Sequence, residues 1–258
     1  MTPPRQEWTL DTRRLGRRVL VYDRVDSTNA LGLALAQDEA ADGLVLLARE
    51  QTAGRGQYGR SWQAPAGSSV LLSAVLFPPP ALRRPALLTA WAAVSVCEAV
   101  REAAGLEASI KWPNDVLLGG RKACGILIEQ RGGAVAGVGL NVNQSQQTFE
   151  DADLPEATSL AARAGRQFDC EAVARLLIRR LDAEYGRLVG GDVEPLEAAW
   201  RQRLGLLGQE VTAECHDGDV RGRLLELAFA GVMLELPGGA VRQVAPEAIR
   251  QLRGEEGS

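Results

Sequence analysis

The sequence predicts an α+β fold, with a central mixed or antiparallel sheet, packed helices and a small C-terminal β-barrel. Three observations predict it. Double glycines separate several strand-length apolar runs, which is typical of tight antiparallel hairpins. The alanine-rich segment 87–104 contains no proline and predicts a buried helix. From residue 209 onward, short alternating runs follow one another closely, as they do in small barrels.

The first part of the chain predicts strands over 18–22, 43–49 and 68–77, and the prolines at 78–80 end the third strand. Residues 26–29 supply several helix N-cap side chains, so the apolar stretch 30–36 predicts a short helix. Residues 50–67 are polar and rich in glycine, and they predict a loop between the second and third strands.

After the long helix, which is expected to end near Gly105, the double glycines 119–120 and 132–133 predict hairpins. Residues 144–153 are polar and predict a loop, whereas helical spacing of apolar residues returns later. The remaining expected strands are 108–112, 116–118, 122–130, 134–141, 211–214, 220–227, 232–236 and 241–244, and the expected helices are 171–188 and 195–204.

This pattern divides the chain into three segments. Residues 1–18 carry five arginines and are expected to form a basic, solvated tail. Residues 19–204 form the main α+β domain, and a change near Gly205 begins the C-terminal barrel, 205–258.

Composition excludes several classes of protein. With 258 residues, 46% hydrophobic and 24% charged, the chain has the balance of a globular protein rather than a disordered one. Its net charge of -4 argues against a general nucleic-acid binder, and its longest apolar run is too short for a membrane span. The four cysteines have neither zinc-site nor redox-pair spacing, so we expect them reduced and buried in a cytoplasmic protein.

Scarce residues narrow the chemistry. The chain has a single histidine, His216, which falls in a polar turn and is expected to face solvent rather than act as a catalytic base. Of the 29 basic residues only Lys111 and Lys122 are lysines, and they flank one Trp-Pro-Asn-Asp turn. A compact ammonium and a forked guanidinium are not equivalent beside a phosphate, although two chance surface lysines remain the alternative.

The segment 51–62 is the strongest local signal. Three glycines let its backbone approach a ligand closely, while Arg55 and Arg60 supply cationic forks, so the segment predicts an anion cradle. It lacks the Gly-Lys-Ser/Thr ending of a phosphate-binding P-loop, and no helix pattern follows it as in a dinucleotide site. A plain surface loop is the alternative.

Two further segments carry polar groups at strand ends. In 111–115, Pro113 fixes a turn from which Asn114 and Asp115 project, and Asp115 could hold Mg²⁺ through oxygen; an ordinary turn is the alternative. Lys122 begins the next strand and would point along the sheet into any cavity there. The small residues of 137–143 indicate close packing within a strand.

Together these segments resemble the bacterial biotin protein ligases of the monofunctional type, the biotin–[acetyl-CoA-carboxylase] ligases. The matching motifs occur in the same order as in that family and extend from residue 19 to the C-terminal part of the chain. They are Ser-Thr-Asn at 27–29, Gly-Arg-Gly-x-x-Gly-Arg-x-Trp at 54–62, Lys-Trp-Pro-Asn-Asp at 111–115, Gly-Arg-Lys-x-x-Gly-Ile-Leu-x-Glu at 120–129 and Gly-x-Gly-x-Asn at 137–141.

The resemblance implies a catalytic fold similar to the class II aminoacyl-tRNA synthetases, followed by an SH3-like barrel. It also implies an ATP-dependent ligase that activates biotin as biotinyl-5′-AMP and transfers it to a lysine of a biotin carboxyl carrier protein. Biotin and ATP would be the substrates, with Mg²⁺ held by Asp115. By resemblance, Lys122 and Arg55 would be catalytic; Ser27, Thr28, Asn29, Gln51, Arg55, Gly56, Gln57 and Lys122 would bind biotin; and Arg55, Arg60, Trp62, Lys111, Asn114, Asp115 and Asn141 would bind ATP.

Two departures from the family pattern matter. The family commonly has arginine where this chain has Gln57, so we expect weaker retention of the adenylate. Some relatives carry an N-terminal DNA-binding domain, but too few residues precede the first expected strand here, so no DNA binding is expected. Relatives often form homodimers through the central sheet, which favours a homodimer.

Two other functions compete with this interpretation. A lipoate or octanoate ligase or transferase would share the fold, although the arginine-rich glycine loop and the Lys-Trp-Pro-Asn-Asp turn favour biotin. A non-catalytic biotin-sensing regulator would need a DNA-reading element, which the sequence does not supply.

Overall fold

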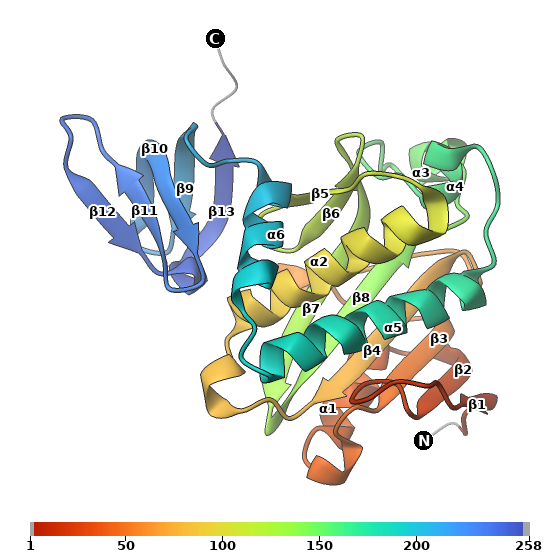
Figure 1. The fold of residues 1–258 in the computed structure, drawn as a ribbon. Coiled ribbons are helices and arrows are strands. Elements are labelled where there is room, and N and C mark those ends of the chain that lie inside the picture. The colour runs from red at the N-terminus through yellow and green to blue at the C-terminus, as the bar shows by residue number, and fades with distance from the viewer. Residues whose placement is uncertain (1–2, 255–258) are drawn as a thin grey trace.

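The computed structural model describes residues 3–254 and contains two β-sheets (Figure 1). The larger sheet has eight strands in the order β1-β2-β3-β4-β8-β7-β6-β5. Its strands are β1 (Gln6–Trp8), β2 (Val19–Val25), β3 (Val45–Gln51), β4 (Ser69–Leu76), β5 (Ser109–Lys111), β6 (Asp115–Leu118), β7 (Arg121–Arg131) and β8 (Gly133–Asn141). The expected α+β class is confirmed.

The large sheet is mixed because one pair of neighbouring strands runs parallel. β2 and β3 are parallel and are connected through helix α1 (Thr28–Leu35), while the other neighbours in the sheet are antiparallel. Ser27 caps α1 by accepting a hydrogen bond from the Ala30 amide, as its place in the sequence predicts. The hairpins β6–β7 and β7–β8 turn at the double glycines, where Gly119, Gly120 and Gly132 have positive φ.

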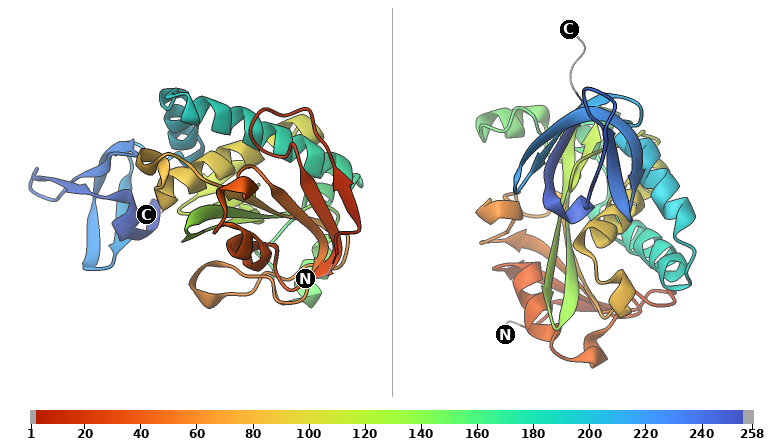
Figure 2. Two further views of the ribbon diagram at one scale, coloured as in Figure 1. Left: turned by 90° about the horizontal axis from the view of Figure 1, so that it is seen from below. Right: turned by 90° about the vertical axis from the view of Figure 1, so that its left-hand side faces the viewer.

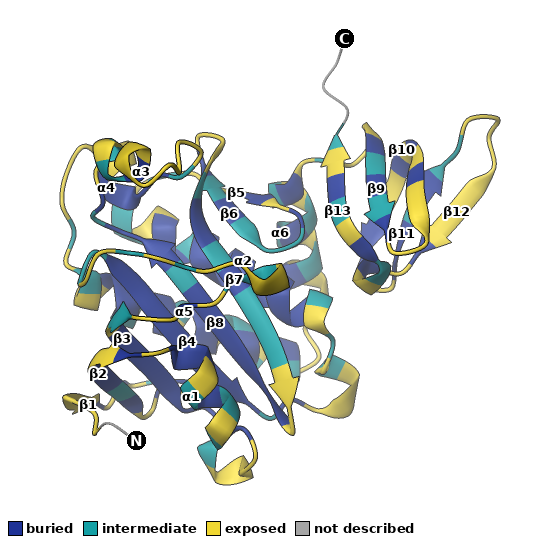
Figure 3. Ribbon diagram, turned by 180° about the vertical axis from the view of Figure 1, so that it is seen from behind, coloured by how far each residue is buried: buried dark blue, intermediate teal, exposed yellow. Residues whose placement is uncertain are grey.

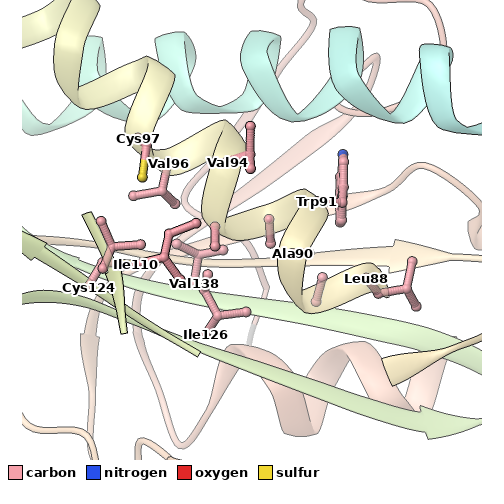
Figure 4. Close-up of a cluster of buried hydrophobic side chains, with 14 of the residues drawn as sticks. Leu88, Ala90, Trp91, Val94, Val96, Cys97, Ile110, Cys124, Ile126 and Val138 are labelled. Carbon is pink, nitrogen blue, oxygen red and sulfur yellow. The ribbon is translucent and has the colours of Figure 1, made fainter. Parts of the chain in front are cut away.

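Helices α2 (Pro85–Ala104) and α5 (Cys170–Val189) cover one face of this sheet, and α1 lies on the other face (Figures 1 and 3). Figure 4 shows how α2 packs on the strands through small and medium side chains, among them Ala90, Val96 and Cys97. Because α5 covers the outer side of α2, that helix is buried along most of its length, which explains its alanine-rich composition. This leaves the α1 face of the sheet available for a cavity.

The C-terminal β domain follows helix α6 (Glu194–Leu204) and stands to one side of the main body (Figure 2). It is a five-stranded antiparallel sheet in the order β12-β11-β10-β9-β13. The four expected strands are present, but the sequence did not predict the fifth, β13, which is amphipathic and short. These strands are β9 (Glu210–Cys215), β10 (Gly218–Ala228), β11 (Gly231–Glu235), β12 (Val241–Val244) and β13 (Ile249–Gly254).

The expectation of a solvated basic tail over 1–18 is wrong for its described residues. β1 pairs with β2, and Leu15 is fully buried. The carboxylate of Asp182, on α5, accepts hydrogen bonds from the backbone amides of Arg13, Arg14 and Leu15 at 2.9, 2.7 and 2.8 Å. The expectation failed because it rested on the many arginines and gave no weight to buried apolar residues such as Leu15. The carboxylate that binds this segment, Asp182, also lies far away in the sequence.

Residues 144–153 also differ from expectation, because they contain helix α3 (Gln146–Asp151) instead of a continuous loop. Ser145 caps this helix and Phe149 is its buried residue, so one apolar anchor and one cap suffice for a single turn and a half. Helix α4 (Leu160–Ala164) follows, and short 3₁₀ turns occur at Glu39–Ala41, Gln57–Gly59, Pro80–Leu82 and Pro246–Ala248.

Other expectations concern single residues. All four cysteines are free; three are buried as expected, but Cys170 is only half-buried. His216 is exposed in the turn between β9 and β10, as expected. Within residues 3–254, none of the helices has the length and apolar character required to span a membrane.

Candidate active site

A cavity of about 430 Å³ lies against the α1 side of the large sheet, beneath the loop 52–68. This volume falls in the range of small-molecule sites. The structure brings every site residue expected from the sequence to the wall of this one cavity. They are Ser27, Thr28, Asn29, Gln51, Arg55, Gly56, Gln57, Arg60, Trp62, Lys111, Asn114, Asp115, Lys122 and Asn141.

One end of the cavity carries a network of neutral hydrogen-bonding groups. The Gln51 amide oxygen accepts from the Thr28 backbone amide at 2.7 Å and lies 3.0 Å from the Thr28 hydroxyl. The Ser73 hydroxyl lies 2.7 Å from Thr28 Oγ1 and 2.6 Å from Asn29 Oδ1. Ser73 is buried in the middle of β4 and was not among the site residues expected from the sequence. The network fixes the side chains at this end in one arrangement.

Asn29 has protein partners for both atoms of its amide. Its Nδ2 donates to Glu129 Oε2 at 2.9 Å and to the Leu127 carbonyl at 3.3 Å, while its Oδ1 accepts from Ser73. Any Cβ at Gly137 would collide with this amide, which explains the glycine in β8. Asn29 therefore holds α1 against β7 and β4 and shapes the cavity wall.

The glycine loop, residues 54–62, closes over the cavity as a tight hairpin. Arg55 and Ser61 form an isolated antiparallel bridge, and the Gly56 amide donates to the Arg60 carbonyl at 2.7 Å. Tyr58 sits at the tip with φ 56°, an unusual value for a residue with a side chain, and it is 65% exposed. The side chain of Arg55 reaches back to the sheet, where its Nη2 lies 2.8 Å from Glu129 Oε2.

Trp62 forms part of the cavity floor. Its ring lies on β7 and β8, and there is room for it because Gly125 and Gly139 have no side chains. A Cβ at Gly125 or Gly139 would come within 2.9 or 2.6 Å of the indole ring. The indole Nε1 is buried without a hydrogen-bond partner among the described residues, so it can donate to a bound molecule. Lys122 Nζ lies 5.8 Å from the centroid of the ring, within range of a cation–π contact.

The opposite end of the cavity is cationic. Lys122 Nζ pairs with Asp115 Oδ1 at 2.6 Å, and Lys111 lies across from Asp115 where β5 pairs with β6. Asn114 fixes the turn between those strands, since its side chain donates to the Ile126 carbonyl at 2.7 Å. Asn141 is similarly occupied, because its Nδ2 donates to the Thr158 carbonyl at 3.1 Å.

Asp115 is the one carboxylate on the cavity wall among residues 3–254, and no cluster of three or more His, Cys, Asp or Glu that could hold a metal occurs in that range. The wall is therefore no protein cage for a metal. It fits Mg²⁺ that arrives with a nucleotide, because Mg²⁺ is commonly bound through one or two carboxylates together with substrate phosphates.

The cysteine beneath the site does not belong to its chemistry. Burial raises the pKa of the Cys124 thiol well above its usual range, although the positive charge of Lys122 acts in the opposite direction. Cys124 is therefore a neutral core residue under β7.

Two contributions to the site were not expected from the sequence. Glu129 belongs to the motif at 120–129; it does not line the cavity itself, but its carboxylate accepts hydrogen bonds from Asn29 and Arg55, which do. Gln251 and Arg253 reach the wall from β13, and a short polar–apolar alternation at 249–254 was the one signal that could have pointed to them.

The comparisons with known proteins agree with this geometry. Residues 21–144 match the biotin/lipoate A/B protein ligase family. The biotin–[acetyl-CoA-carboxylase] ligase of Paracoccus denitrificans is 37% identical over 235 residues, which cover 87% of this chain and 96% of that protein. The corresponding ligase of Mycobacterium tuberculosis is 34% identical over 268 residues, with 98% of both chains covered.

A bifunctional relative and a solved structure complete the comparison. The bifunctional ligase/repressor BirA of Bacillus subtilis is 32% identical over 231 residues, which cover 87% of this chain and 71% of that protein. The structure of the biotin protein ligase from Aquifex aeolicus in complex with biotin and ATP superposes with a TM-score of 0.78 at 26% identity, covering 92% of this chain and 99% of that chain. On this evidence the chain belongs to the biotin protein ligases of the biotin/lipoate A/B protein ligase family.

Proposed function

We propose that this cavity activates biotin with ATP, giving biotinyl-5′-AMP and pyrophosphate, and that the chain then transfers biotin to a lysine of a biotin carboxyl carrier protein, a subunit of acetyl-CoA carboxylase. The relatives named as biotin–[acetyl-CoA-carboxylase] ligases and the Aquifex aeolicus complex with biotin and ATP support it. The observation that carries the proposal is how charge is distributed along one cavity. One end has neutral hydrogen-bonding groups, the other end is cationic, and both lie under the glycine loop.

In the first step, a carboxylate oxygen of biotin attacks the α-phosphorus of ATP, the bond to the β-phosphate oxygen breaks, and pyrophosphate leaves. Both reactants are anions, so the protein must neutralise their repulsion and align them. Lys122 and Arg55 would act at the reacting carboxylate and α-phosphate, while Lys111 and Arg60 would bind the other phosphates.

The neutral end suits the ureido ring of biotin, which needs uncharged donors and acceptors. Ser27, Thr28 and Gln51 would contact the ring, and Asn29 would hold them in place, since both atoms of its own amide already have protein partners. Gly56 and Gln57 would close over the valeryl chain and the carboxylate.

The cationic end would hold the nucleotide. Trp62 offers a ring face and an unpaired indole N–H, and Asn114 and Asn141 shape the walls around it. Asp115 would hold the Mg²⁺ of MgATP, which would offset phosphate charge. The Asp115–Lys122 pair would then open, because Lys122 is needed by the reacting phosphate.

In the second step, the amine of the carrier lysine attacks the acyl carbon of biotinyl-5′-AMP, an amide forms and AMP leaves. The closed glycine loop would shield the mixed anhydride from water until the carrier arrives.

The proposal also covers the state of the protein in the cell. We propose that it is a homodimer, that it binds no DNA and that it acts in the cytoplasm. Its four free cysteines suit a reducing compartment.

The decisive experiment is biotin-dependent exchange of pyrophosphate into ATP, with lipoate and octanoate as control substrates. Biotin alone should support exchange, and a biotin carrier domain should become labelled when biotin and MgATP are supplied. The Lys122→Ala variant should do each about a thousandfold more slowly than the parent. Exchange that depends on lipoate, or labelling by Lys122→Ala at the parent rate, would contradict the proposal.

A further inference from the structure

Trp112, the second residue of the Lys-Trp-Pro-Asn-Asp turn, borders the cavity, but its indole N–H is bonded outside it. The residue is 4% exposed, and its Nε1 donates a hydrogen bond of 3.0 Å to the carbonyl of Ile249. Ile249 is the first residue of β13 in the C-terminal β domain. A buried indole N–H needs a partner, and here it finds that partner in the other domain.

The ring of Trp112 also begins an aromatic column that crosses the domain boundary. Its centroid lies 5.6 Å from the ring of Trp200 on α6, and Trp200 stacks on Phe229 of the C-terminal domain at 5.0 Å. Figure 1 shows α6 between β5 and the strands of the smaller sheet. The turn that carries Lys111 and Asp115 is therefore fastened to the C-terminal domain on its outer side.

The anchor point matters because β13 continues from it to the cavity. Gln251 and Arg253, two and four residues after Ile249, both line the cavity. Lys111 and Asp115, which belong to the same turn as Trp112, also line the cavity. The hydrogen bond from Trp112 to Ile249 thus joins the two stretches of chain that supply these parts of the wall from different domains.

Other bonds hold the domains together independently of this one. Arg84 donates to the Phe229 carbonyl at 2.7 Å and pairs with Glu247 at 2.8 Å, while Glu197 accepts from the Phe229 amide at 2.6 Å. Loss of the indole N–H should therefore shift β13 locally and leave the C-terminal domain attached.

We propose that Trp112 is a positioning residue that assembles the nucleotide end of the site from two domains. The inference rests on the function proposed above. It follows that the indole N–H supports ATP binding and not biotin binding, because the neutral network around Thr28 lies on α1, β3 and β4, and its hydrogen bonds join residues of those elements rather than β13.

The test compares two conservative variants of the same aromatic column. Trp112→Phe removes the N–H that bonds β13, whereas Trp200→Phe removes a similar volume and leaves that bond in place. We expect Trp112→Phe to raise the KM for ATP in the exchange assay about tenfold, with the KM for biotin changed less than about twofold. Trp200→Phe should leave both constants within about twofold of the parent values.

A second substitution separates the hydrogen bond from the packing. The benzothiophene analogue of tryptophan at position 112 keeps the bicyclic ring and replaces only the N–H by sulfur, so it should fold and should raise the KM for ATP as Trp112→Phe does. An equal rise in Trp200→Phe, an equal rise in the KM for biotin, or an unchanged KM for ATP with the analogue would overturn the inference. Absence of biotin-dependent exchange in the unaltered protein would instead refute the proposed function.

Discussion

Glu129 and Arg55 form an ion pair of 2.8 Å that fastens the glycine loop to the end of β7. The same carboxylate oxygen, Oε2, accepts the Asn29 amide at 2.9 Å. One oxygen thus links the loop, which carries Arg55 and Arg60, to α1, which carries Thr28 and Asn29 of the neutral network. The Glu129 side chain is 25% exposed, so the pair is only partly screened by solvent.

Replacement of Glu129 by glutamine should loosen the loop while keeping an acceptor for Asn29. We expect the KM values for biotin and for ATP each to rise about threefold, because partly exposed ion pairs contribute modestly. Trypsin should also cleave faster after Arg60 in the ligand-free variant. Glu226→Gln, which alters an exposed carboxylate on β10, serves as the control; unchanged KM values and unchanged cleavage in Glu129→Gln would argue against this role.

Gln57 lines the cavity at the start of the loop's 3₁₀ turn, at the position where the resemblance to biotin protein ligases implies an arginine. A guanidinium here could make charged hydrogen bonds to the adenylate phosphate, so we predict that Gln57→Arg slows release of biotinyl-5′-AMP about five- to tenfold. Rapid gel filtration of the preformed complex measures that rate. Gln57→Met, similar in length but uncharged, should not slow release; a rate in Gln57→Arg equal to or above that of the parent would contradict the prediction.

Lys122 occupies a narrow position between Asp115 and the ring of Trp62. We expect Lys122→Ala to lower the rate of pyrophosphate exchange about a thousandfold, because it removes a cation aimed at the developing charge. Lys122→Arg keeps the charge but has a broad planar head, and Gly125 and Trp62 leave little room for it, so it should recover no more than about a tenth of the parent rate. Full activity in Lys122→Arg would show that charge alone suffices. Urea unfolding of both variants, compared with that of the parent, would confirm that they remain folded.

The sequence predicted the parts of this protein that depend on local patterns. The β7–β8 hairpin followed from Gly132 and Gly133, and α2 followed from its uninterrupted apolar composition. The site residues could be predicted as a set because each belongs to a short motif, and the structure brings them to one cavity. The roles of Glu129 and Trp112 could not, because their partners are more than 70 residues away in the chain.

Asp182 is another residue whose role depends on partners far away in the chain. Its carboxylate accepts hydrogen bonds from three backbone amides of the segment that was expected to be a tail. Asp182→Asn would place an amide N–H₂ against at least one of those donors. We predict a loss of about 2 kcal/mol in the free energy of unfolding, measured by urea denaturation. Asp192→Asn, at an exposed position just beyond α5, is the matched control. Equal stability of Asp182→Asn and the parent would mean that these hydrogen bonds are replaced by others.

Cys97 should make the protein sensitive to alkaline pH. Burial between α2 and the sheet raises the pKa of its thiol from 9.0 to about 12. Between these two values the unfolded thiol loses its proton while the folded thiol keeps it, so the unfolded state binds fewer protons and stability falls as pH rises. The stabilising contribution is complete below pH 9.0 and is lost on the way to about pH 12. From about pH 8 to about pH 10.5 the expected loss in the free energy of unfolding is roughly 2 kcal/mol.

Urea unfolding at these two pH values tests the prediction. The free energy of unfolding should decline less in Cys97→Ala than in the parent. Val96→Ala, which also trims a buried side chain of α2 but removes no ionisable group, should decline as the parent does; parallel declines in all three proteins would exclude Cys97 as the cause.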